Sequence, residues 1–154
     1  MDWAFTASFI APQHPPLDLN QLAQEDPSLL LSKPFYLQPH IHLFEWDYDL
    51  LAFRELFLQE EVDYWTEHRF PALPKKQSSY FALYRTLKNS QAWREITKGE
   101  YLLLQLFQKG SSVEAACEVM EEQELAVYEQ VAANLQKWIQ DWTRLGWLTL
   151  KEKV

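Results

Sequence analysis

The two residue types that most restrict backbone conformation are unevenly distributed along this chain of 154 residues. All eight prolines lie at or before Pro74, and all three glycines lie at or after Gly99. Proline fixes φ and removes a backbone N–H donor, whereas glycine commonly follows the end of a helix. We therefore expect a loop-rich first part, residues 1–74, and a second part, residues 75–154, built from regular elements.

The composition is that of an ordinary globular protein. Hydrophobic residues make up 47% and charged residues 23% of the sequence, which is typical of a domain with a buried core. No run of about 18 apolar residues is present, and no basic segment precedes an apolar stretch at the N-terminus. The single cysteine, Cys117, excludes an internal disulfide and a thiolate metal cluster. We expect a cytoplasmic protein with no membrane contact.

The charge is unevenly distributed along the chain. The net charge of −8 disfavours nonspecific nucleic-acid binding, which requires a positive surface. From Arg69 to Lys98, however, the chain has seven basic residues and a single acid, Glu95. Acidic segments at 45–67 and 114–129 flank this basic stretch. We expect no nucleic-acid partner, and a basic central region that suits an acidic peptide.

The first part of the chain shows four candidate elements. They are helices at 2–11, 17–23 and 50–68 and a strand at 40–48. The first helix places four apolar side chains mostly on one side: Trp3, Phe5, Phe9 and Ile10. Asp49 is suited to cap the third helix, and the segment 71–76 has the composition of a linker.

The second part begins with a predicted hairpin. Strands at 79–87 and 91–96 flank a turn at 88–90. Thr97 and Glu100 have capping-box spacing, which predicts a helix that runs to Lys109.

Two more helices and a strand are expected after Gly110. A second capping box at Ser111–Glu114 begins a helix that runs to about residue 121. The last helix covers 124–145, with apolar residues at helical spacing: Val127, Val131, Leu135, Trp138, Trp142 and Leu145. A short strand at 147–150 follows. The fold class is α+β: a proline-rich docking region, then a winged-helix-like module of a β-hairpin, three helices and a closing strand.

Alternation along 40–48 places His40, His42, Phe44, Trp46 and Tyr48 on one strand face. Two histidines at this spacing can bind one metal ion, which would make the chain an independent metalloenzyme. No spacing elsewhere supplies further ligands. Structural histidines are the favoured interpretation, and an interface role is the third, because the aromatic residues continue the same face.

No constellation for catalysis is present in the sequence. Serine, histidine and aspartate do not occur in a triad pattern, and there is no phosphate-binding glycine loop. Cys117 has small neighbours, Ala115 and Ala116, which favours a buried and inert thiol. We expect no catalytic residue and no metal site in this chain.

The hairpin mixes cationic and aromatic side chains: Tyr84, Arg85, Lys88, Trp93 and Arg94. A two-stranded element exposes an edge to which an incoming peptide can add as a strand, and the long helix could form a second wall. A purely structural wing is the simpler alternative. A DNA-binding winged-helix regulator is another, although the long helix has only Lys137 and Arg144 as basic residues.

Two stretches of the sequence resemble a known family. The first comprises residues 2–18 and 35–44, the latter reading Phe-Tyr-Leu-Gln-Pro-His-Ile-His-Leu-Phe; the second comprises 82–85, 100–104, 110–116 and 145–148. They resemble the partner proteins of multinuclear non-haem iron enzymes that modify ribosomally made peptides, of the MbnC-like, TglI-like and HvfC-like types. The second stretch is similar to their PqqD-like peptide-recognition module. The separate N-terminal helical domain of longer members has no counterpart here.

The resemblance implies a non-catalytic subunit that forms a heterodimer with a TIM-barrel enzyme holding two or three iron ions. The subunit presents the leader of a precursor peptide, and the enzyme modifies a cysteine of that peptide. The leader is expected to add to strand 91–97, and a proline at Trp93 or Ile96 should weaken its binding. The implied peptide-binding residues are Tyr84, Arg85, Trp93, Arg94, Glu95, Ile96, Tyr128, Asn134 and Leu135. The face from His40 to Tyr48 is the candidate for enzyme docking.

Overall fold

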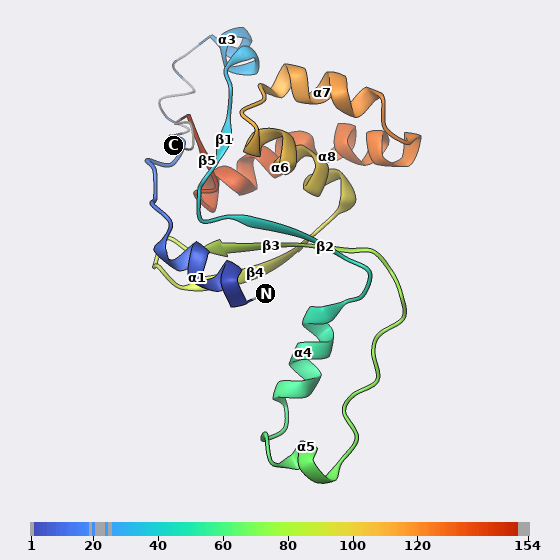
Figure 1. The fold of residues 1–154 in the computed structure, drawn as a ribbon. Helices are drawn as coiled ribbons and strands as arrows, with labels where there is room; N and C mark the ends of the chain where they lie inside the picture. Colours follow the sequence, from blue (N-terminus) through green and yellow to red (C-terminus); the bar gives the residue numbers. More distant parts are fainter. Residues whose placement is uncertain (1, 19, 21–23, 25, 151–154) are drawn as a thin grey trace.

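The structure is a computed structural model that describes residues 2–18, 20, 24 and 26–150. It confirms the α+β class, with a small antiparallel sheet and a group of helices on one of its faces (Figure 1). Most of the helix predicted at 17–23 lies outside the described residues. Among the described helices, none combines the length and the apolar character needed to cross a membrane.

The main sheet has three antiparallel strands in the order β2-β3-β4. They are β2 (His42–Trp46), β3 (Ser79–Arg85) and β4 (Gln91–Ile96). The predicted hairpin is confirmed, and Asn89 takes a left-handed φ of 61° in its turn. The pairing of β2 with β3 was not predicted, and β2 is shorter than the expected strand 40–48.

The boundary expected at residue 74 lies between two paired strands of one sheet, β2 and β3. A second small sheet also joins the two parts, because β1 (Tyr36–Leu37) pairs with β5 (Leu148–Thr149). The C-terminal strand is therefore bound to the proline-rich part, and one core includes Phe35, Leu37 and Ile41 together with residues of the second part.

Three helices follow the hairpin: α6 (Lys98–Gln108), α7 (Val113–Glu121) and α8 (Leu125–Arg144). The capping box of α6 is confirmed, since Thr97 Oγ1 accepts from Glu100 N at 3.2 Å and Glu100 Oε2 accepts from Thr97 N at 3.1 Å. Ser112, not Ser111, caps α7 by accepting from Ala115 N. The cap is therefore the serine directly before Val113, the first residue of α7, one position later than the capping box predicted.

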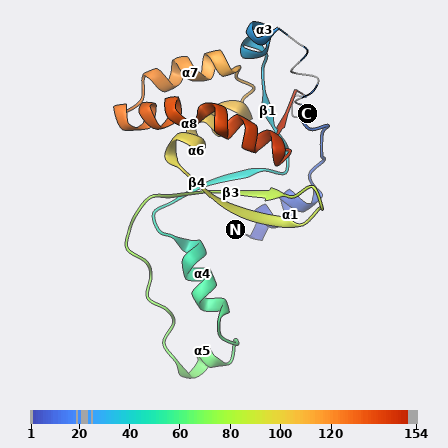
Figure 2. The same ribbon diagram turned by 180° about the vertical axis from the view of Figure 1, so that it is seen from behind.

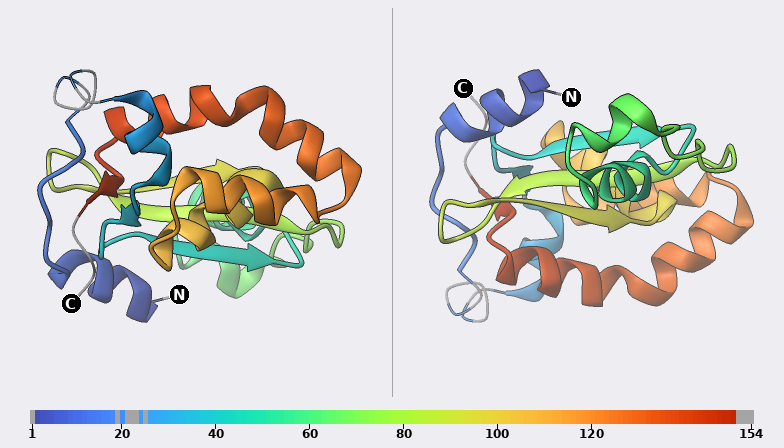
Figure 3. Two further views of the ribbon diagram at one scale, coloured as in Figure 1. Left: turned by 90° about the horizontal axis from the view of Figure 1, so that it is seen from above. Right: turned by 90° about the horizontal axis from the view of Figure 1, so that it is seen from below.

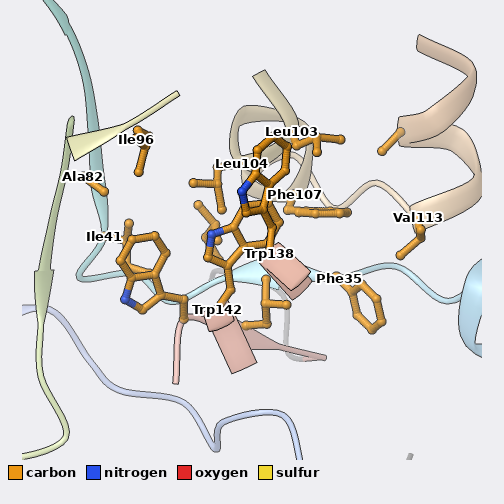
Figure 4. Close-up of a cluster of buried hydrophobic side chains, with 14 of the residues drawn as sticks. Phe35, Ile41, Ala82, Ile96, Leu103, Leu104, Phe107, Val113, Trp138 and Trp142 are labelled. Atoms are coloured by element: carbon orange, nitrogen blue, oxygen red, sulfur yellow. The ribbon is translucent and has the colours of Figure 1, made fainter. Parts of the chain in front are cut away.

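The core lies between the sheet and these helices (Figure 4). Phe107 of α6 makes an edge contact with Trp142 of α8, at 6.1 Å between ring centroids, and Trp138 stacks on Trp142 at the same distance. Gly99 makes the close contact of α6 with α8 possible, because a Cβ there would lie 2.8 Å from Gln130 Oε1. These contacts fix the position of α8 relative to the end of β4.

Helix α1 (Asp2–Ile10) packs against the opposite face of the sheet from α6 and α8 (Figure 1). Arg85 holds it there, since its guanidinium donates to the carbonyls of Phe9 at 2.8 Å and Ala11 at 3.0 Å. The predicted helix is confirmed, but the apolar side chains expected mostly on one side of it are not the ones that it buries. Small side chains at positions 4 and 8 are the buried ones, whereas Trp3, Phe9 and Ile10 are exposed. A helix this close to the sheet needs small residues at the contact.

The predicted helix 50–68 is wrong as a single element. It forms α4 (Leu50–Leu58) and α5 (Tyr64–Glu67), and Asp49 caps α4 as expected. With the coil 68–78 they form a hairpin-shaped arm that extends away from the sheet (Figure 2). Its aromatic residues stack mainly on one another: Phe57, Trp65 and Phe70. A further helix, α3 (Pro27–Ser32), was not predicted and packs against α7.

Candidate functional site

Strand β4 forms one outer edge of the main sheet. In the described ranges, no strand pairs with this edge. In antiparallel strands, pairs of facing residues that exchange backbone hydrogen bonds alternate with pairs that do not. Thr86 N donates to Ser90 O at 2.8 Å, which makes these two residues a hydrogen-bonded pair and fixes the alternation along β3 and β4. The backbone of Ala92, Arg94 and Ile96 therefore faces β3, while the N–H and C=O groups of residues 91, 93 and 95 point to the open edge.

Helix α8 runs beside this edge in the opposite direction to β4 (Figure 3). Lys98, just after β4, lies 3.6 Å from Glu124 at the start of α8. Arg94, in the middle of β4, lies 3.9 Å from Asp141 near the end of α8. A polypeptide that added to β4 as a further strand would thus lie close to one face of α8.

The side of α8 toward β4 is polar. Gln130 accepts a hydrogen bond from Gly99 N at 3.1 Å, and Asp141 pairs with Arg94, which fixes this side of the helix. Asn134 and Lys137 fall between them at spacings of four and three, so they share the same side. Asn134, one of the predicted peptide-binding residues, is half-buried, and its amide donates to Gln130 O.

The two arginines of the hairpin already have partners. Arg94 lies 3.5 Å from Glu100 and 3.9 Å from Asp141, and its guanidinium lies over the ring of Trp147 at 5.7 Å. Arg85 caps α1. Two carboxylates compensate the charge of Arg94, and Arg85 uses its N–H donors on the carbonyls at the end of α1. The predicted attraction of an acidic peptide therefore needs other cations.

The other predicted residues of the hairpin divide between the two faces of the sheet. Tyr84 and Ile96 face the helices: Tyr84 contacts Trp147 with ring centroids 4.9 Å apart, and Ile96 is buried in the core. Trp93 and Glu95 lie on the opposite face, because side chains alternate along a strand. The structure therefore places three of these residues on the edge strand β4 and Tyr84 on the central strand β3, and it divides them between the two faces of the sheet.

Tyr128 and Leu135, also predicted to bind the peptide, lie away from β4. They line a hollow of about 110 Å³ between α7 and α8, together with Cys117. Burial, with a smaller contribution from Glu121, raises the pKa of the Cys117 thiol. A thiol with a raised pKa is protonated near neutral pH, which agrees with an inert side chain.

A feature that sequence reasoning missed lies at the start of β4, beside the hairpin turn. A hollow of about 320 Å³ separates the hairpin turn from the end of α8, and its walls are Tyr84, Thr86, Leu87, Lys88, Ser90, Arg144 and Leu145. The signal for it was weak, because the hollow depends on the packing of two elements that are about 55 positions apart in sequence.

His40 differs from the rest of the predicted docking face. It is fully buried, its Nδ1 accepts from Arg85 N at 3.1 Å, and its carbonyl accepts from Ser8 Oγ at 2.8 Å. Burial, helped by the charge of Arg85, lowers the pKa of His40 from 6.5 to about 4. His40 is therefore neutral at pH 7 and structural in its contacts.

The remaining docking residues form an aromatic cluster under the sheet. His42, Phe44 and Trp46 share this face with Trp93, which lies 5.4 Å from Phe44 between ring centroids. Trp3 of α1 makes an edge contact with His42. Helix α1 covers part of the cluster, so less of this strand face is available to a docking partner than the sequence predicted. Tyr48 lies after the end of β2, in the turn before α4.

The described residues contain no group of three or more His, Cys, Asp or Glu side chains placed to hold a metal ion. A comparison of the chain with models of known protein families and with curated protein sequences found no match.

Proposed function

We propose that this protein is a non-catalytic adaptor that binds the leader of a ribosomally made precursor peptide. The observation that carries the proposal is the open edge of β4 beside α8, where a peptide strand would gain backbone hydrogen bonds from residues 91, 93 and 95. The element order supports it: the hairpin β3–β4 is followed by three helices and the short strand β5, the same order as in the module inferred from the sequence.

The adaptor would serve a TIM-barrel enzyme with two or three iron ions, in a cytoplasmic heterodimer. The enzyme would modify a cysteine of the peptide, and this chain would bind no iron itself. Tethering the leader makes delivery of the cysteine almost intramolecular, at an effective concentration of roughly millimolar. This division of roles follows from the family resemblance.

The arm formed by residues 47–78 is a better candidate for enzyme docking than the strand face alone. It has exposed apolar side chains at Leu58, Val62 and Leu73, each more than half accessible. Between positions 49 and 67 the chain has a single base, Arg54, and six acids: Asp49, Glu55, Glu60, Glu61, Asp63 and Glu67. The partner surface that faces this helical part of the arm should therefore be apolar with a basic rim, whereas the returning coil carries Arg69, Lys75 and Lys76. The aromatic cluster under the sheet, with Phe44 and Trp46, would extend the contact.

A peptide-binding measurement tests the main proposal. Purified protein would be screened against a phage-displayed library of random 12-residue peptides, and enriched peptides would be titrated by fluorescence anisotropy. We expect saturable binding that is weakened when the edge of β4 is blocked by Glu95→Pro. Failure to enrich any peptide, combined with a shift of duplex DNA in a gel at modest salt, would favour the winged-helix regulator instead.

Docking is tested separately by co-expression with any TIM-barrel iron enzyme that a neighbouring reading frame encodes. Leu58→Asp combined with Val62→Asp should abolish co-purification, since it places charges in the apolar part of the arm. Leu125→Asp, an equally exposed position at the start of α8, is the matched control and should leave co-purification intact. Docking through the arm would be contradicted if both variants lost co-purification equally, or if neither variant lost it.

A further inference from the structure

The hollow between the hairpin turn and the end of α8 has an apolar floor and a basic rim. Leu87, Leu145 and the ring of Tyr84 supply the apolar surface, and Lys88 and Arg144 supply the charge. No acidic side chain is among its lining residues. A cavity of about 320 Å³ accommodates a large aliphatic or aromatic side chain.

The rim charges differ in their surroundings from the arginines of the sheet. Lys88 is exposed, and in the part of the chain that the structure describes it forms no ion pair. Arg144 is 72% exposed and lies 3.8 Å from Asp141, which Arg94 also contacts. Arg94 also pairs with Glu100 at 3.5 Å, so two carboxylates face the two guanidinium groups here. Arg144 shares its carboxylate with Arg94, and Lys88 supplies the uncompensated charge of the rim.

The hollow continues the open edge of β4. Ser90, the residue before β4, lines it, so a strand paired with β4 would end beside it. Successive residues of such a strand point to opposite faces, and residues two apart on one face are separated by roughly 7 Å. A peptide side chain in the hollow and its second neighbour on the same face could therefore reach Leu145 and the rim cations together.

We propose that this hollow selects a large apolar side chain with a carboxylate within two residues of it, in the peptide bound to β4. This inference rests on the proposed function and adds to it a specificity element at one end of the bound peptide. The apolar side chain would be desolvated between Leu87 and Leu145, and the carboxylate would approach Lys88 and Arg144.

The test compares the phage selection on three proteins that differ only in exposed cations. In the native protein, enriched peptides should share a large apolar residue with Asp or Glu within two positions. The double variant Lys88→Glu with Arg144→Gln should bind these peptides about tenfold more weakly and select a basic residue at the acidic position. Lys109→Glu, at an exposed position after α6 and outside both the hollow and the β4 edge, should leave the selected pattern unchanged.

The apolar half of the site is tested by Leu87→Ser. Leu87 is 63% exposed, so the change should leave the fold intact, as checked by circular dichroism, and weaken the selected peptides several-fold.

The outcomes separate this inference from the proposed function. One outcome is that the selected peptides lose affinity with Glu95→Pro, and so need the open β4 edge, and yet lack the pair of an apolar and an acidic residue. That outcome would overturn the specificity site alone. The same conclusion holds if the affinity of these peptides is unchanged both in the double variant Lys88→Glu with Arg144→Gln and in Leu87→Ser. A selection without enriched peptides, or with peptides insensitive to Glu95→Pro, would overturn the peptide-binding function and the specificity site with it.

Discussion

Glu95→Pro should weaken peptide binding without affecting the fold. The side chain of Glu95 is exposed, and its backbone N–H points to the open edge of β4 rather than to β3. Proline removes that donor and fills the space beside it, and edge strands tolerate proline at such positions. Arg94, the preceding residue, already has the extended backbone that a following proline requires.

The expected size follows from one backbone hydrogen bond. A net contribution of about 1 kcal/mol corresponds to roughly fivefold in affinity. Glu95→Ala is the matched control, because it loses the same side chain and keeps the N–H. Fluorescence anisotropy should therefore give a Kd for Glu95→Pro at least about fivefold above that for Glu95→Ala, with urea midpoints that agree closely. Equal affinities in two folded proteins would refute the addition of a strand at this edge.

The same alternation revises the two substitutions suggested by the sequence. The N–H of Ile96 faces Tyr80 of β3, and its side chain is buried. Ile96→Pro would therefore break the sheet rather than block the edge. Trp93→Pro removes an outward donor, but it also removes the ring that packs against Phe5 and Phe44, so a loss of binding would not distinguish the two causes.

Three further predictions concern the fold. Arg85→Gln removes the guanidinium bonds to the carbonyls at the end of α1 and should lower the free energy of unfolding by about 2 kcal/mol in urea melts; an unchanged midpoint would contradict this anchor. The pKa of His40 lies near 4 in the folded protein, below its ordinary value of 6.5, so the unfolded state binds the proton more readily. Its contribution to stability should be complete above pH 6.5 and be lost as the pH falls toward 4, by up to about 3 kcal/mol, and a His40→Gln protein with the same pH profile would count against it. Gly99→Ala would place a Cβ 3.1 Å from Val131 Cγ2 and 3.3 Å from the buried ring of Trp138, and it would displace Gln130 Oε1, the acceptor of Gly99 N. It should cost about 1–3 kcal/mol, and native stability would contradict the tight contact of α6 with α8.

Local signals predicted the second part of the chain well. The capping box at Thr97 and the glycine after each long helix are local features, and both Gly110 and Gly146 have the expected positive φ. The apolar spacing of α8 is also local, and Val131, Trp138 and Trp142 are buried as it requires.

Contacts between distant segments were beyond such reasoning. Neither the pairing of β2 with β3 nor that of β1 with β5 has a sequence signal, because the partners are separated by more than 30 residues. The break between α4 and α5 has a related cause. No side chain of α4 is fully buried, so tertiary packing does not extend that helix, and its local pattern alone was a poor guide.

The expected proximity of the hairpin and α8 is seen in the ion pair between Arg94 and Asp141. The binding of a peptide between them stays a prediction. The roles of Arg85 and Arg94 depend on partners far away in the sequence, at α1 and at Asp141. A count of charged residues along the sequence treats these arginines as free to bind a peptide, whereas the structure shows that both already have partners within the protein.

Amide hydrogen exchange of the peptide complex, measured residue by residue by NMR, tests the central claim most directly. In the free protein, the amides of Ala92, Arg94 and Ile96 should be protected, and those of residues 91 and 93 and of Glu95 should exchange quickly, because they face the open edge. Saturation with a selected peptide should protect the second set while leaving the first unchanged. Continued fast exchange at residues 91, 93 and 95 in the saturated complex would contradict the claim.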